Sequence, residues 1–150
     1  MNSRTMDWYV LLRFFHIVSF ATWFGTVFAS LFLLKTLEPK LTDSTGNPEE
    51  YAKILRSYIK RETKVADAAF KLTIASGLLM ALLTQTWSIP LFVKIALVIL
   101  QFALTMGYIV KAIQPLTYPC SPSDYKRWYN LFAISLSMFA LVLSVSFFLL

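Results

Sequence analysis

The chain has one histidine, His16, which lies within the long apolar stretch that runs from Phe14 to Leu34. An imidazole at such a place can ligate a transition metal or form a buried hydrogen bond. If a helix begins near Trp8, His16 lies about 12 Å along it, since each residue adds about 1.5 Å of rise. So short a side chain cannot reach water from that depth. His16 therefore requires a partner inside the protein.

Two kinds of partner suit an imidazole at this depth. One is a polar side chain of the last apolar stretch, and the candidates are Ser135, Ser137 and Asn130. The other is haem iron, with the cations Arg13 and Lys94 near the outer surface as partners for the propionates. Because the chain has a single histidine, it cannot by itself provide bis-histidine ligation. The sixth position of the iron would be open, or filled by a methionine, by Lys94 or by another subunit.

Helical spacing places different side chains on the two faces of this first stretch. Phe20 and Trp23 share the face of His16, and their rings suit a flat apolar ligand such as a porphyrin or a quinone. Small residues occupy the opposite face at every fourth position, and these are Ala21, Gly25 and Ala29. Such spacing lets membrane helices approach closely. We expect this face to pack on another helix of the chain, a second copy or a partner membrane subunit.

The composition indicates the class of protein that positions these groups. Hydrophobic residues make up 57% of the 150 residues and aromatics 16%, more than a soluble domain of this length can bury. Four largely uncharged stretches approach the roughly 20 residues that a helix needs to cross a bilayer. We therefore predict an all-α integral membrane protein, a single four-helix transmembrane bundle with helices at about 8–36, 48–85, 90–113 and 124–150.

Basic residues predict the orientation of this bundle, because Lys and Arg accumulate in short cytoplasmic connections. They cluster in the first and third connections, as Lys35, Lys40, Lys53, Arg56, Lys60, Arg61, Lys64, Lys111, Lys126 and Arg127. Both termini are then outside, in a multi-pass protein of the cytoplasmic (inner) membrane. A basic face beside anionic lipid accounts for the net charge of +6, so we expect the bilayer as partner and no nucleic acid.

The remaining polar residues have simpler interpretations. The second predicted helix begins at Asn47-Pro48-Glu49-Glu50 and is amphipathic at first, which indicates a cytoplasmic extension. Within it, Asp67 and Lys71 are four residues apart and are expected to pair. Cys120 is the one cysteine and is expected to be an inert loop residue, since no Cys/His cluster accompanies it.

Several short motifs occur in an order that resembles a known family. They are His16 followed by Trp23-Phe24, Lys60-Arg61, Thr73 followed by Gly77-Leu78, Phe92-Val93-Lys94-Ile95-Ala96-Leu97, and Arg127-Trp128-Tyr129-Asn130. Over nearly the whole chain this order resembles the HemJ-type membrane proteins and the related copper-resistance-D-like group. The resemblance implies a four-helix membrane protein that binds haem b and oxidises protoporphyrinogen IX. The family's helix-1 histidine and helix-3 lysine would correspond to His16 and Lys94.

The chain departs from the family pattern at three places. The tyrosine-histidine pairs that follow helix 1 and lie on helix 3 are replaced by residues 31–35 and 106–109, neither of which contains a histidine. The acid after the helix-4 asparagine is Leu131. The resemblance therefore implies haem binding more directly than catalysis.

Three functions are consistent with these residues. The first is an oxidoreductase in which haem at His16 passes electrons from a porphyrinogen to a quinone or another carrier. The second is a non-catalytic small subunit, haem-binding or structural, of a larger membrane respiratory or electron-transfer complex. The third is a permease of the copper-resistance-D-like group.

Overall fold

The described residues, which are 2–109, 111 and 118–149, form helices and connecting turns with no strand. Within these residues the computed structural model has four α-helices and one π-helical segment: α1 (Ser3–Leu41), α2 (Pro48–Thr84), α3 (Ile89–Leu104), η1 (Thr105–Ile109) and α5 (Pro122–Phe148). The predicted all-helical fold is therefore confirmed. Residues 110, 112–117 and 150 lie outside the described part, and so do the ends of the predicted helices 90–113 and 124–150.

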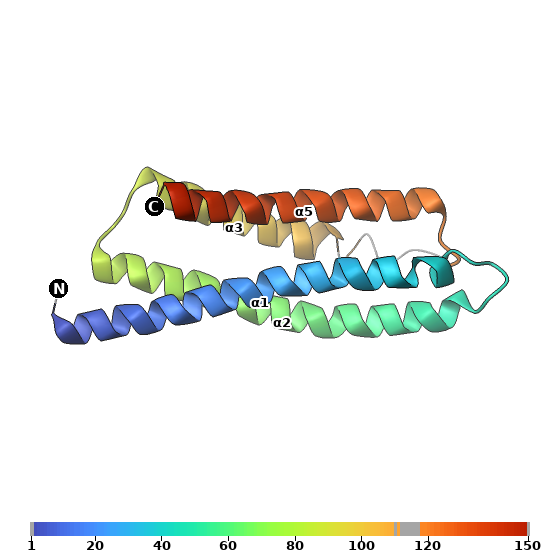
Figure 1. Ribbon diagram of the computed structural model, residues 1–150, viewed down its shortest axis with the longest axis horizontal. Helices are drawn as coiled ribbons and strands as arrows, with labels where there is room; N and C mark the ends of the chain where they lie inside the picture. The colour runs from blue at the N-terminus through green and yellow to red at the C-terminus, as the bar shows by residue number, and fades with distance from the viewer. Residues whose placement is uncertain (1, 110, 112–117, 150) are drawn as a thin grey trace.

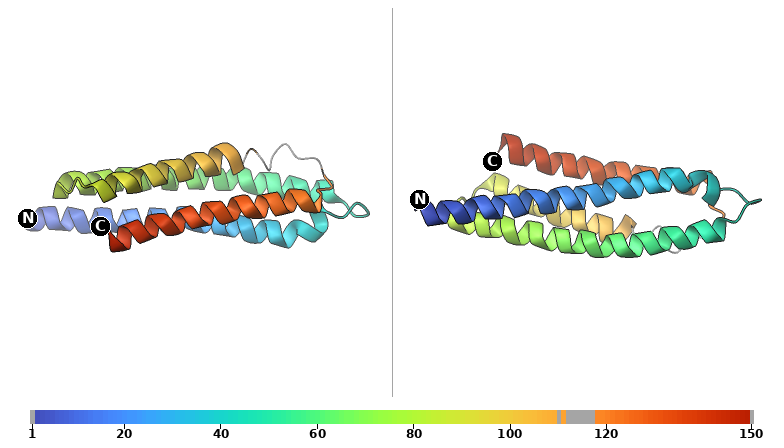
Figure 2. Two further views of the ribbon diagram at one scale, coloured as in Figure 1. Left: turned by 90° about the horizontal axis from the view of Figure 1, so that it is seen from above. Right: turned by 60° about the horizontal axis from the view of Figure 1, so that its bottom comes forward.

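The helices run alongside one another in an elongated bundle, in which α1 lies beside α2 and α3 lies beside α5 (Figure 1). Helix α1 also packs against α5, which joins the two pairs (Figure 2). Both chain termini lie at one end of the bundle, and the α1–α2 connection and the start of α5 lie at the other. The first basic connection and the start of α5, which carries Lys126 and Arg127, therefore share one end, as the predicted topology requires.

Three of the helices, α1, α2 and α5, are long and apolar enough to cross a membrane. Helix α3 is equally apolar in character but has only 16 residues, and it continues directly into the five-residue η1. The α-helix predicted to run on to residue 113 therefore changes to a π-helix at Thr105. Single π-helical turns of this kind occur inside α-helices, frequently at functional sites.

Helix α1 is longer at both ends than the predicted 8–36. It begins at Ser3, where the Asn2 side chain accepts a hydrogen bond from the Arg4 N–H. It continues through Pro39 to Leu41, although proline removes a backbone donor and usually ends a helix. Tertiary packing outweighs that cost, because Leu41 is fully buried and its carbonyl accepts a bond of 2.8 Å from the Cys120 N–H.

The other predicted boundaries are close to the observed ones. Helix α2 begins at Pro48 with Glu49 and Glu50 in its first turn. It ends before Gln85, whose φ of 52° is left-handed. Helix α5 begins two residues before the predicted 124, because Ser121 and Asp124 form a capping box around its first turn.

The hydrogen bond between Cys120 and Leu41 anchors the segment before α5 to the end of α1, and the Cys120 side chain is buried. Burial, with a smaller effect of the nearby Asp124, raises the pKa of the Cys120 thiol to about 11. Since only the thiolate reacts, we expect iodoacetamide at pH 8 to alkylate Cys120 about a hundredfold more slowly than an ordinary thiol. The rate should rise toward pH 11 and on unfolding in SDS, as measured by mass spectrometry. Fast alkylation of the folded protein would contradict this docking of the segment.

Aromatic side chains from all four α-helices meet at the centre of the bundle. Trp23 of α1 lies edge-on to Phe139 of α5, with ring centroids 4.8 Å apart, and to Phe70 of α2, at 5.4 Å. Phe70 in turn stacks on Phe102 of α3, at 3.9 Å. These rings bring the two helix pairs together.

Candidate functional site

His16 is half-buried at the α1–α2 contact and is hydrogen-bonded to α2. Its Nδ1 lies 2.9 Å from the Thr73 carbonyl oxygen and 3.1 Å from the Ser76 hydroxyl oxygen. A carbonyl oxygen only accepts, so Nδ1 carries the proton and donates it to Thr73. Nε2 then retains its lone pair, and it has no hydrogen bond to any described residue. This is the tautomer of an imidazole that ligates a metal through Nε2, with its other nitrogen held by a carbonyl.

The hydrogen-bond partners that we predicted for His16 on the last helix are wrong. Ser135 of α5 instead accepts a bond of 2.6 Å from the Gln101 Nε2 of α3, and Ser137 donates to the carbonyl of its own helix at Ala133. The reason is the helix pairing, because α1 packs along α2 and turns the face of His16 toward it.

Gly77 makes room for the imidazole on α2. A Cβ atom at this position would lie 3.0 Å from Cε1 of His16 and 3.4 Å from Nδ1. A Cβ contact of 3.0 Å is tighter than most, so a larger residue would shift the ring by a few tenths of an ångström relative to the Thr73 carbonyl. The motif of Thr73 and Gly77 thus has a physical role in this structure: one residue holds the ring and the other makes space for it.

Of the two predicted cations, the structure places Lys94 near His16. Lys94 is half-buried on α3 and close enough for its charge to act on the imidazole. Arg13 is exposed on α1, one turn toward the N-terminus from His16, and has no ion pair with any described residue. Lys94 is therefore the better placed partner for an anionic group bound beside His16.

The two predicted aromatic residues differ in how accessible they are. Trp23 has no exposed surface, because Phe20, Phe70 and Phe139 pack edge-on around it. Phe20 is half-buried, 5.6 Å from Phe139 between ring centroids, so part of its ring remains open. A ligand at His16 could contact Phe20 but would have to displace core side chains to reach Trp23.

The small-residue face of α1 does not pack within the chain. Ala21, Gly25 and Ala29 are all exposed, and a Cβ at Gly25 would meet no atom within 4 Å. Of the occupants that we considered, helices of the same chain are therefore excluded for the described residues.

The donor set around His16 suits haem better than a metal ion held by protein ligands alone. Among the described residues, no group of three or more His, Cys, Asp or Glu side chains could hold a metal ion. An axial haem ligand needs only one imidazole with a free Nε2, and Lys94 could bind a propionate. The side-chain chemistry of His16 and Lys94 is compatible with haem, whereas Trp23 is part of the core.

The predicted ion pair on α2 is confirmed. The Lys71 amine lies 2.7 Å from the Asp67 carboxylate, and both side chains are exposed, at 72% and 37%. This pair lies at the surface of the bundle, which agrees with a structural role.

Sequence reasoning missed Glu62, whose carboxyl group lies between α1 and α2. The Ser30 hydroxyl donates a hydrogen bond to it, and Ser30 is only 7% exposed. Tyr58, one turn earlier on α2, lies within electrostatic range of Glu62. The spacing of Glu62 along α2 could have indicated its position. It continues a buried stripe with intervals of three and four residues, formed by Leu55, Ile59, Ala66 and Ala69.

Replacing Ser30 by Ala should destabilise the folded protein, because it leaves the carboxyl group of Glu62 without this donor. The expected loss is about 1–3 kcal/mol in the free energy of unfolding. It can be measured by following helical circular dichroism as SDS is titrated into the detergent-solubilised protein. The matched control is Ser137→Ala, which removes an exposed hydroxyl that bonds only within α5. Equal stability of the two variants would contradict the inferred role of Ser30.

The fold and the composition together define the class of this protein, an all-helical membrane protein. Comparison with known proteins gives no more specific assignment, since no family model, curated protein or solved structure matches the chain.

Proposed function

We propose that this membrane protein binds haem b, with His16 as the residue that would hold the iron. One observation carries the proposal, the hydrogen bond from Nδ1 of His16 to the Thr73 carbonyl. It fixes the tautomer, orients the ring and leaves Nε2 as the ligating atom, as a carbonyl partner does for other metal-binding histidines.

The side chains around His16 have separate roles in this proposal. Lys94 binds a propionate of the cofactor, and Phe20 offers the open part of its ring to the porphyrin. The Ser76 hydroxyl, 3.1 Å from Nδ1, also holds the imidazole in place. The cofactor supplies one-electron redox chemistry, and the protein orients it and excludes water.

The reaction that this site would serve is the oxidation of a reduced porphyrin, with a quinone or another carrier as electron acceptor. The support is the resemblance to HemJ-type proteins in the order of the motifs, together with the proximity of His16 and Lys94. The loss of the other family histidines makes haem binding the first property to test.

The absorption spectrum of the purified protein tests the proposal. Protein from haem-replete cells should show a Soret band, and Lys94→Met should lower the amount of haem retained through gel filtration. Lys126→Met, which removes an exposed cation of α5, is the control. A colourless wild-type preparation would refute haem binding. If the band is present, complementation of a strain without protoporphyrinogen oxidase tests for the enzymatic activity.

We also propose that the bundle lies in the cytoplasmic membrane, with the end that carries the α1–α2 connection on the cytoplasmic side. The support is the positive-inside distribution of Lys and Arg. The α1–α2 connection and the start of α5, with Lys126 and Arg127, lie at that one end of the bundle (Figure 1).

A second candidate function, a subunit of a larger membrane complex, is favoured by the exposed face of Ala21, Gly25 and Ala29. Gly25→Leu should leave the fold of the single chain intact, because nothing lies within 4 Å of the added Cβ. The same change should weaken association through this face by at least tenfold, measured by crosslinking in native membranes. Ala96→Leu, at an exposed position of α3, is the control. Unchanged crosslinking in Gly25→Leu would exclude this face as an interface.

A further inference from the structure

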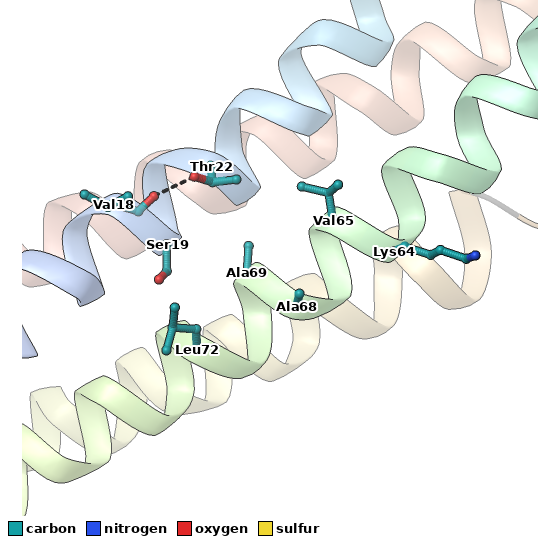
Figure 3. A pocket seen from close by; sticks show the side chains of 8 residues that line it. All are labelled: Val18, Ser19, Thr22, Lys64, Val65, Ala68, Ala69 and Leu72. Carbon is teal, nitrogen blue, oxygen red and sulfur yellow. Dashed lines mark hydrogen bonds between the residues drawn. The ribbon is translucent and has the colours of Figure 1, made fainter.

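A groove of about 420 Å³ runs along the α1–α2 pair, and His16 is not among the residues that line it (Figure 3). Its lining comes from one turn of α1 and two turns of α2. The residues are Val18, Ser19, Thr22, Lys64, Val65, Ala68, Ala69 and Leu72. Ser19 and Ala69 are buried, and the other six are exposed.

The groove presents apolar surface despite its two hydroxyl residues. The Ser19 hydroxyl donates to the Phe15 carbonyl at 2.5 Å, and the Thr22 hydroxyl donates to the Val18 carbonyl at 2.8 Å. Both donors are therefore satisfied within α1, and neither needs a ligand. Since the remaining uncharged lining consists of Ala, Val and Leu, hydrocarbon is the chemistry that this groove accommodates.

One end of the groove is positively charged. Lys64 extends away from the α1 residues that line the groove (Figure 3). Lys60 and Arg61 precede it by about one turn, roughly 6 Å of rise, toward the basic end of the bundle. All three are exposed, and none has an ion pair with a described residue. The neighbouring acids are engaged elsewhere, Asp67 with Lys71 and Glu62 with Ser30.

We propose that the groove binds an acyl chain of an anionic phospholipid, whose phosphate is bound by Lys64 together with Lys60 and Arg61. The apolar groove suits the acyl chain of such a lipid. Its cationic end, which faces the cytoplasmic leaflet in the proposed orientation, suits the anionic headgroup. The long stems of lysine and arginine can lie along the apolar surface while their charges reach the headgroups. The inference rests on the proposed orientation in the membrane and is independent of haem.

The charge of the groove also favours a lipid over a second copy of the chain. In a two-fold symmetric dimer across this face, two copies with the same membrane orientation would bring their Lys60–Arg61–Lys64 clusters to the same depth. Like charges placed against each other disfavour such an interface. An anionic headgroup neutralises these charges instead.

Native mass spectrometry of the detergent-solubilised full chain can test this site. The probes are phosphatidylglycerol and phosphatidylcholine with identical acyl chains. We expect the wild type to retain phosphatidylglycerol preferentially, and Lys64→Gln to weaken that binding about fivefold, as the loss of one cation near a lipid surface implies. Ala68→Phe fills the groove and should reduce binding of the same lipid. Lys126→Gln on α5 is the control and should bind like the wild type.

Distinct outcomes would overturn the proposal. Equal retention of the two lipids by the wild type, or equal binding by Lys64→Gln and the control, would exclude a specific anionic site. If Ala68→Phe does not fold, as judged by circular dichroism, Val18→Phe tests the opposite wall. Loss of binding in Lys64→Gln, with full binding in a folded groove-filling variant, would show that the headgroup binds without a chain in the groove. Absorption spectra of the same samples report haem separately, so the two proposals can fail independently.

Discussion

Replacing His16 by Ala is expected to remove the Soret band of the purified protein completely, with the helical circular dichroism retained. No other imidazole exists in the chain to replace the ligand, and the lost side chain is the one whose Nε2 is free. Because the His16 ring lies over Gly77, its loss exposes a small surface of α2 rather than opening the aromatic core. The measurement is the absorbance of the Soret band at equal protein concentration.

A second variant separates the position of the ring from its presence. Gly77→Leu keeps His16 but places a Cβ 3.0 Å from Cε1, which displaces the imidazole and weakens its hydrogen bond to the Thr73 carbonyl. We expect haem retention to fall at least tenfold and the remaining band to shift. Ala75→Leu, on an exposed position of the same helix, is the control.

An unchanged band in His16→Ala would contradict the assigned ligand outright.

Replacing Trp23 by Ala is expected to lower the stability of the folded protein strongly. Its ring is fully buried and contacts Phe20, Phe70 and Phe139, which belong to three different helices. Because lipid is as apolar as this core, the stability is lost through weaker van der Waals packing. Exposure of the ring to water makes no contribution. We expect a decrease of about 3 kcal/mol in the free energy of unfolding, the lower end of the range for large aromatic residues.

The matched control for this change is Trp87→Ala, because Trp87 is 46% exposed in the turn before α3. SDS titration monitored by circular dichroism compares the two variants. A stability equal to that of Trp87→Ala would mean that Trp23 does not anchor the core. Loss of haem at unchanged stability would instead assign Trp23 to the cofactor site, as its place on the face of His16 first indicated.

Several features could be predicted from the sequence because they depend on local chemistry. Apolar runs of sufficient length predict helices, and the Asn47–Pro48–Glu49–Glu50 start of α2 is correct to the residue. The Asp67–Lys71 pair follows from a spacing of four residues alone. The need of the His16 imidazole for a partner followed from its depth in an apolar stretch, and the structure supplies that partner.

What the sequence alone determined, then, was the class of protein and the positions of its helices, together with the one imidazole that needs a partner. Only the tertiary structure decided that this partner is Thr73 of α2, that Glu62 bonds to Ser30, and that α1 continues through Pro39. The physical reason is the solvent. In a membrane the exposed faces are as apolar as the buried ones, as Phe28 and Phe32 on the surface of α1 illustrate. Hydrophobic periodicity therefore cannot indicate which face of a helix meets which neighbour, and side-chain packing between the helices makes that choice.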